Sequence, residues 1–293
     1  MAALDVQQSP IISAFFDDAT STISYLVADP RSKRAAIIDS VLDYNPHAGR
    51  TDTRSADAIL EHIRKNDFSI DWHLETHVHA DHLTAAVYLR KKLGGQIAIG
   101  EQVRAVQSTF RDVFNAESEF VPNGRQFDHL FHNGERFRIG TLEARVVFTP
   151  GHTPACVTYL VGGAAFVGDT VFMPDYGTAR CDFPGGDART LYRSIQMLLQ
   201  LPPDTVLYMC HDYRPGGRPP MWQTTVAEER AANIHVHDGV SEDTFVTMRT
   251  NRDKTLDMPA LILPAVQINM RAGHFPPAED NGIHYLKIPL DTI

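Results

Sequence analysis

Thr76-His77-Val78-His79-Ala80-Asp81-His82 places three imidazoles and a carboxylate within six positions of the chain. Bringing such groups together is costly to desolvate unless they bind something. Neutral imidazole and carboxylate are ligands for zinc and iron. The stretch follows a short predicted strand at residues 70–75, so its ligands would be held rigidly at a strand end. We interpret it as part of a metal site.

Three further residues of metal-binding type follow singly along the chain. They are His152 in Pro150-Gly151-His152-Thr153, Asp169 in Gly168-Asp169-Thr170, and His211 in Cys210-His211-Asp212. Asp169 and His211 each come after a predicted strand, so we expect both at the same end of a sheet as the cluster. A single Asp is often a turn or helix cap, and a single His is more often hydrogen-bonded or on the surface. That interpretation is kept for His62, His73, His129, His132, His235, His237, His274 and His284.

Composition limits the class of protein. The 293 residues are long enough for a sizeable core. A net charge of -9 argues against a nucleic-acid partner, which would call for a basic stripe. Residues 1–10 carry no secretory signal pattern, and the most apolar stretch, 258–266, is short and broken by prolines, so no membrane span is expected. Three cysteines without a Cys-x-x-Cys pair fit reduced thiols, and we expect a cytoplasmic protein.

The order of predicted elements indicates a mixed α/β layered fold. Strands alternate with helices and hairpins; we expect strands at 15–27, 34–39, 70–75, 96–100, 136–139, 142–149, 157–161, 164–167 and 206–209. Residues 40–52 are expected to form a polar loop. One helix should run over 55–65 with Ser55 as its N-cap, another should open at Asp81 and end at Gly94, and a third should contain Leu191 to Leu199. No sharp linker is visible, so we predict one domain over 1–293, with a helical and irregular extension from about 226.

The ordered set of metal-binding residues resembles the metallo-β-lactamase superfamily. The motifs of that superfamily are a His-x-His-x-Asp-His cluster, a later Gly-His, a Gly-Asp and a final His, and all occur here in order. The resemblance implies an αββα sandwich with the metals at the edge between two sheets. It does not fix the reaction, because members of the superfamily differ in chemistry.

The stretch Arg180-Cys181-Asp182-Phe183 resembles the Arg-x-Asp-Phe segment of the persulfide dioxygenases within this superfamily. Their relatives, the glyoxalase II thioesterases, have an Arg here without the Asp-Phe. The loop at 40–52 and the residues at 215–223 look more like a bacterial subgroup of β-lactamase-like hydrolases linked to sulfide detoxification. The resemblance runs from about residue 23 to 273.

Carried over to this chain, the resemblance implies one Fe(II) held by His77, His152 and Asp169. The substrates would be glutathione persulfide and O2, and the products sulfite and glutathione. His79, Asp81, His82 and His211 would orient the ligands and a bound water by hydrogen bonds, or would bind a second metal. Arg180 would hold a glutathione carboxylate, and Asp182 would brace Arg180 or a ligand histidine. Tyr213 and Asn269 would line the pocket. No catalytic residue beyond the metal site is implied. The resemblance also implies a homodimer and a separate rhodanese partner.

Two other interpretations remain open. All seven ligands are present, so a dinuclear zinc hydrolase of thioesters or lactones is the strongest alternative, with the metals activating a bridging hydroxide. The sequence does not name the metal, since availability and geometry decide it. A catalytically silent binding module is the third interpretation, and the intact ligand set counts against it.

Overall fold

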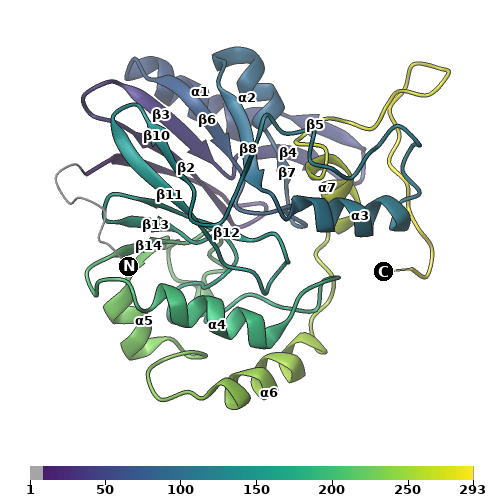
Figure 1. Cartoon of the computed structure of the whole chain (residues 1–293). Coiled ribbons are helices and arrows are strands. Elements are labelled where there is room, and N and C mark those ends of the chain that lie inside the picture. Colours follow the sequence, from purple (N-terminus) through teal and green to yellow (C-terminus); the bar gives the residue numbers. More distant parts are fainter. Residues whose placement is uncertain (1–8, 293) are drawn as a thin grey trace.

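The structure is a computed structural model, and it describes residues 9–292. Two six-stranded sheets form its centre (Figure 1). The strands of the first sheet, in spatial order, are β1 (Ile11–Asp17), β2 (Thr22–Ala28), β3 (Arg34–Ile38), β6 (Ser69–Leu74), β8 (Gln96–Gly100) and β9 (His129–Phe131). Those of the second are β10 (Arg136–Ile139), β11 (Leu142–Phe148), β12 (Val157–Val161), β13 (Ala164–Phe166), β14 (Val206–Tyr208) and β15 (Gln223–Thr225).

Helices cover the outer face of each sheet (Figure 1). On the first sheet lie α1 (Arg54–Lys65), α2 (Ala86–Leu93) and α7 (Ile262–Asn269); on the second lie α4 (Ala188–Leu198), α5 (Val226–Ala232) and α6 (Glu242–Asp253). The helix α3 (Val103–Val113) packs beside α7 at one end of the sandwich. The expected αββα sandwich is therefore confirmed.

Strand periodicity explains why the sheets are sandwiched. Successive side chains of a strand point to opposite faces, so a strand buried on both sides reads as a continuous apolar run. In β2, Tyr25 and Val27 pack between the two sheets, whereas Leu26 and Ala28 pack against the helices. In β12, Tyr159 likewise faces the inter-sheet core. Each sheet thus has an apolar inner face and an apolar outer face that the helices must cover.

Several expected elements are wrong. Residues 15–27 are not one strand, because β1 and β2 form an antiparallel hairpin around residues 18–21. Residues 40–52 are not a loop, because β4 (Val41–Asn45) pairs with β5 (Arg50–Asp52) and with β7 (Leu83–Thr84). That pairing also delays the second helix, which begins at Ala86 rather than Asp81.

The expected cap of the first helix is wrong as well. The N-cap of α1 is Thr53, and Ser55 lies inside the helix. The hydroxyl of Ser55 donates to the Asp43 carboxylate at 3.0 Å instead of capping its own helix. The helix end expected at Gly94 is confirmed, with Gly94 as the C-cap at a positive φ of 74°.

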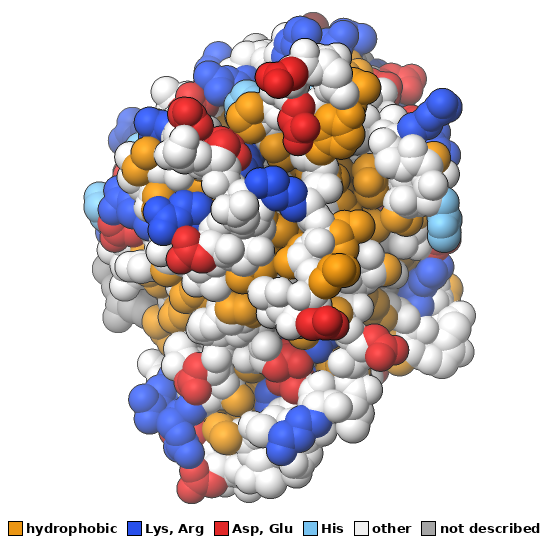
Figure 2. All heavy atoms as spheres, turned by 90° about the vertical axis from the view of Figure 1, so that its right-hand side faces the viewer, with side chains coloured by type: hydrophobic (Ala, Val, Ile, Leu, Met, Phe, Trp, Pro, Cys, Tyr) orange, Lys and Arg blue, Asp and Glu red, His pale blue; other side chains and the backbone are white. Residues whose placement is uncertain are grey.

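The C-terminal segment after α7 runs along one face of the molecule. On the face in Figure 2, hydrophobic side chains gather through the middle, with charged side chains around them. Ile283, Tyr285, Ile288 and Leu290 of this segment are exposed. None of the helices within residues 9–292 is long and apolar enough to cross a membrane.

Candidate metal centre

The seven predicted metal-binding residues lie just beyond strand ends. His77 to His82 follow β6 in the first sheet, whereas His152, Asp169 and His211 follow β11, β13 and β14 in the second. β11 and β13 are both antiparallel to β12, and β14 is parallel to β13, so these three strands end at one edge of the sheet. The topology thus brings the ligands of both sheets to one end of the sandwich.

The first cluster joins His77, His152 and Asp169. One ligand atom from each lies within 4.8 Å of the others. His152 Nε2 is 3.7 Å from Asp169 Oδ2. All three side chains are buried. Two imidazoles and one carboxylate around a common point match the facial triad of non-haem Fe(II) enzymes.

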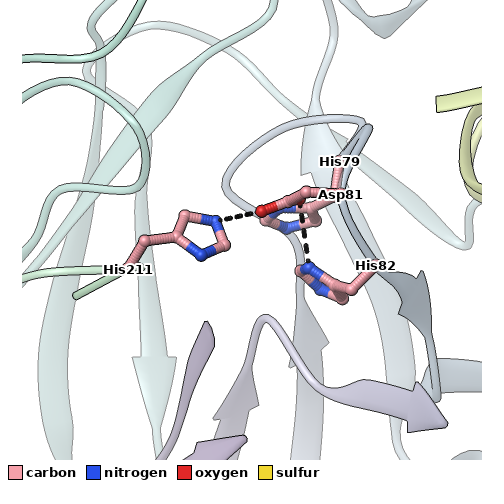
Figure 3. Close-up of side chains that lie close together, drawn as sticks. All are labelled: His79, Asp81, His82 and His211. Carbon is pink, nitrogen blue, oxygen red and sulfur yellow. Dashed lines mark ion pairs between the residues drawn. The ribbon is translucent and has the colours of Figure 1, made fainter. Parts of the chain in front are cut away.

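The second cluster joins His79, Asp81, His82 and His211 (Figure 3). His211 reaches across from the second sheet, and its Nε2 lies 2.8 Å from Asp81 Oδ2. Asp81 Oδ1 lies 3.3 Å from His82 Nδ1. The two clusters adjoin, because His211 Nε2 is also 3.4 Å from Asp169 Oδ1.

Buried polar atoms without a hydrogen bond mark where a metal would sit. Among the described residues, His79 Nδ1 and His82 Nε2 have no hydrogen-bond or ion-pair partner. Asp81 Oδ2 and Asp169 Oδ1 share the single atom His211 Nε2, at 2.8 and 3.4 Å. An orphaned buried polar group costs about 1–3 kcal/mol, so two imidazole nitrogens left without a partner in one place favour a bound ion. Imidazole nitrogens and carboxylate oxygens are suitable donors for zinc or iron. The residues present therefore fit a metal centre.

Asp39, which sequence reasoning missed, orients two of the histidines. Its Oδ1 accepts a hydrogen bond from His79 Nε2 at 3.0 Å, and its Oδ2 accepts one from the Thr76 hydroxyl at 2.8 Å. Because that hydroxyl donates to Asp39, it accepts from His77 Nδ1 at 3.0 Å. Protons on these ring nitrogens leave His79 Nδ1 and His77 Nε2 with lone pairs for a metal.

Thr22 and the backbone of Arg180 orient the remaining histidines. The Thr22 hydroxyl lies 3.4 Å from His82 Nδ1 and 3.3 Å from His211 Nδ1. His152 Nδ1 is 2.8 Å from the carbonyl oxygen of Arg180. A carbonyl can only accept, so Nδ1 of His152 carries the proton and Nε2 faces Asp169 as a ligand atom.

The cluster couples metal binding to proton release. Burial and the neighbouring His79 and His152 hold the pKa of His77 well below its usual value, so His77 is neutral and ready to bind. Burial would also lower the pKa of His211, but Asp81 and Asp169 raise that pKa to about 9. A metal ion must displace the proton of His211.

A cavity of about 380 Å³ opens onto both clusters. Metal-site residues in its wall are Asp81, His152 and Asp169, and the aromatic residues are Phe172, Tyr176, Phe183 and Tyr213. The segment 256–261, between α6 and α7, lines it together with Arg180, Arg249 and Arg252. This volume lies in the usual range for small-molecule sites.

Arg180 and Asp182 lie together, as expected, but the guanidinium is already occupied. Arg180 Nε and Nη2 donate to the two oxygens of Asp182 at 2.6 and 2.7 Å. Arg180 Nη1 donates to the carbonyl oxygen of Asp257 at 2.6 Å. The bidentate face of Arg180 is therefore used within the protein, which does not support the expectation that it holds a substrate carboxylate.

Tyr213 lines the cavity as expected, and its ring stacks on His211 at 5.8 Å between centroids. Asn269 does not line the cavity. It is buried at the end of α7, where Nδ2 donates to the carbonyl oxygens of His79 and His82 at 2.9 and 2.7 Å. Its Oδ1 accepts from the backbone N–H of Thr84 at 2.9 Å. Asn269 thus fixes the shape of the loop that carries the first ligands.

The comparisons with known proteins agree with this geometry. The family model described as "Metallo-beta-lactamase superfamily" matches residues 18–211. The chain belongs to this superfamily, and its clustered His and Asp residues form a site that fits a metal ion.

The similar proteins are named for two kinds of reaction, hydrolysis and oxygenation. A probable metallo-hydrolase of Burkholderia pseudomallei is 57% identical over 96% of this chain and 99% of its own length. The human mitochondrial persulfide dioxygenase ETHE1 is 30% identical over 90% of this chain and 89% of its own. The crystal structure of ETHE1 from Myxococcus xanthus superposes with a TM-score of 0.72, at 30% identity, over 90% of this chain and 100% of that one.

Proposed function

We propose that this protein is an iron-dependent persulfide dioxygenase that converts glutathione persulfide and O2 to glutathione and sulfite. The observation that carries the proposal is the contact of Arg180 and Phe183 with His152. Sequence resemblance singled out this Arg-x-Asp-Phe segment as typical of persulfide dioxygenases. In the structure this segment packs against His152, one of the proposed metal ligands.

Two contacts of this segment act on His152. The Arg180 carbonyl oxygen accepts its Nδ1–H, and the Phe183 ring meets the His152 ring edge to face at 5.1 Å between centroids. Asp182 contributes indirectly, since it holds the Arg180 side chain in place. A change in this segment would therefore alter the orientation of the ligand, which supports a link between the segment and the metal chemistry.

Fe(II) held by His77, His152 and Asp169 would supply redox chemistry and free coordination positions. The protein itself supplies the shape of the cavity. Phe172, Phe183 and Tyr213 line it beside the metal site and give its wall apolar surface. Asp39 keeps the neighbouring imidazoles in a fixed orientation. One water and one O2 per persulfide balance the formation of sulfite and thiol, with release of two protons.

A dinuclear zinc hydrolase of thioesters or lactones is the second candidate. The specific observation in its favour is the complete second cluster, in which His79, Asp81, His82 and His211 each offer one ligand atom within 4.8 Å of the others. The name of the more similar relative, a metallo-hydrolase, also favours hydrolysis. Two metals at this site would polarise a carbonyl and activate a water.

Metal stoichiometry and O2 consumption together test the proposal. The wild type, His152→Ala and His211→Ala would be reconstituted anaerobically with Fe(II) and, separately, with Zn(II). A mononuclear dioxygenase should hold close to one iron, lose it in His152→Ala and retain it in His211→Ala. Loss of an outer-shell residue costs about 10–100-fold in affinity or activity, less than loss of a ligand.

The same proteins would be assayed with an oxygen electrode and glutathione persulfide. Iron-dependent O2 uptake with sulfite formation is expected. Two tightly bound metals in the wild type, a drop toward one in His211→Ala and thioester hydrolysis without O2 uptake would instead establish the hydrolase.

A further inference from the structure

A second, smaller cavity adjoins the metal site on the side of α3 and α7. Its volume is about 20 Å³, and it is a gap in the apolar cluster that joins these two helices to the loop carrying the first ligands. Protein interiors leave few voids that can hold a molecule, so an opening at this place calls for an explanation. Most of its wall comes from apolar side chains of that cluster, namely Val78, Ala80, Val106, Phe110, Phe183 and Val266.

The small cavity shares a wall with the larger cavity at the metal site. Ala80, His152 and Phe183 line both. His152 is a proposed metal ligand, and the Phe183 ring meets the His152 ring edge to face at 5.1 Å between centroids. A molecule in the small cavity therefore lies against a metal ligand, separated from the main cavity by this shared wall.

The polar side chains in the wall of the small cavity are already bonded. His152 Nδ1 donates to the carbonyl oxygen of Arg180 at 2.8 Å. The Thr153 hydroxyl lies 3.1 Å from Cys156 Sγ, and it accepts from the Ala155 N–H at 3.3 Å. A buried water needs about two to four polar partners, which these side chains do not offer. A cavity with such a wall stays free of water and favours an apolar molecule.

We infer that the small cavity is a binding site for O2. A space of about 20 Å³ admits one very small molecule and excludes glutathione persulfide. O2 is apolar, so its transfer from water to an apolar cavity is favourable. The identity of the gas rests on the proposed function, to which the inference adds a separate holding place for the second substrate. Phe183 is then the apolar partition between the two substrates.

Xenon is a suitable probe, because it is apolar, comparable to O2 in size and independent of turnover. Zinc-loaded protein is diamagnetic, so its methyl resonances can be followed by NMR as the xenon pressure is raised. We expect the methyl signals of Val78, Val106 and Val266 to shift with pressure. Those of Val161, which is buried in the core between the two sheets, should not move.

Two substitutions fill the cavity without adding a polar group. Val106→Ile in α3 and Val266→Ile in α7 each add one carbon to its wall. Val103→Ile is the matched control, because it makes the same change in the same helix and apolar cluster, outside the lining of the cavity. Thermal unfolding shows that each variant is folded. One methylene in an apolar pocket changes binding at least about tenfold, so both filled variants should weaken xenon binding by that factor and Val103→Ile should not.

Steady-state kinetics of the iron-loaded protein with varied O2 provide the second measurement. Val106→Ile and Val266→Ile should raise KM for O2 several-fold and leave KM for glutathione persulfide, and kcat at saturating O2, nearly unchanged. Equal effects of Val103→Ile, or an unchanged KM for O2 in both filled variants, would overturn the inference. Normal O2 uptake without xenon binding would overturn the inference alone. A wild type that takes up xenon but consumes no O2 would overturn the proposed function and, with it, O2 as the ligand.

Discussion

Asp39→Asn separates the orienting role of this residue from its contribution to the fold. The Asp39 carboxylate accepts four hydrogen bonds: Oδ1 from the Thr76 N–H and His79 Nε2, and Oδ2 from the Thr76 hydroxyl and, more weakly, the Cys210 thiol at 3.6 Å. Asp39 adopts a positive φ of 51°, a conformation that Asn also tolerates. The substitution therefore changes hydrogen bonding without adding backbone strain.

The expected loss of stability and of metal affinity depends on which carboxylate oxygen of Asp39 the amide nitrogen replaces. Asn would keep its carbonyl oxygen at the Oδ1 position, because the Thr76 N–H and His79 Nε2–H can only donate there. At the Oδ2 position the amide nitrogen of Asn would face the Thr76 hydroxyl and the Cys210 thiol, which both donate to Asp39 in the wild type. Two lost acceptor contacts predict that the metal-free protein is destabilised by about 1–3 kcal/mol. The His79–Asp39 bond would lose its charge, so metal affinity should fall about 10- to 100-fold.

Competition with a chromophoric chelator measures the metal affinity, and urea unfolding of the metal-free protein measures the stability. Asp43→Asn is the control, since Asp43 accepts two bonds from Ser55 in a partly buried setting away from the metal. That variant should lose some stability and keep wild-type metal affinity. Unchanged metal affinity in Asp39→Asn, or an equal loss in both variants, would refute the orienting role.

Three further predictions concern buried groups. Burial raises the pKa of Cys156 to about 12 and that of Cys181 well above its usual value, so both thiols of the native protein should resist iodoacetamide at pH 8. The single variants Cys156→Ser and Cys181→Ser should keep most activity. Rapid labelling of the native protein, or an inactive variant with normal metal content, would count against this prediction. Burial raises the pKa of Glu229 to about 8 from its ordinary 4.5, so in this pH range the folded state retains a proton that the unfolded state loses. The free energy of unfolding therefore falls as pH rises from about 4.5 to 8. Glu229→Gln should remove that loss and gain on the order of a few kcal/mol over the wild type between pH 5 and 8 in urea unfolding, and a constant difference across this range would contradict the prediction. Asn269→Ala should destabilise the protein by about 2–4 kcal/mol and weaken metal binding, because it leaves the Thr84 N–H and the carbonyl oxygens of His79 and His82 unpaired. Unfolding with and without chelator measures both effects. A variant with wild-type metal affinity would show that the loop holds its shape without Asn269.

Local patterns predicted most of the framework. Alternating or continuous apolar runs located the central strands, and ligand-type residues at strand ends located the metal cluster. Asp39 is the last residue of the predicted strand at 34–39 and directly follows the observed β3, so the same strand-end rule applied to it. It was missed because an isolated carboxylate gives no sign that an imidazole 40 residues away will bond to it.

The failures arose where tertiary contacts decided the structure. β4 and β5 are short, and β4 is fixed by pairing with β7, a contact between segments far apart in sequence. α3 has a clear apolar stripe that was overlooked, with Val106 and Phe110 buried against the core.

Asn269 also bears on the order in which the protein becomes functional during synthesis. It is separated from His79 by 190 residues, yet it donates to the backbone of the loop that holds the first ligands. At 5–20 residues per second, roughly 10–40 s pass between the emergence of that loop and the arrival of its brace. A nascent chain would thus expose a histidine cluster to cellular metals before its shape is fixed. The ligand loop therefore takes its final shape only after the last helix has docked.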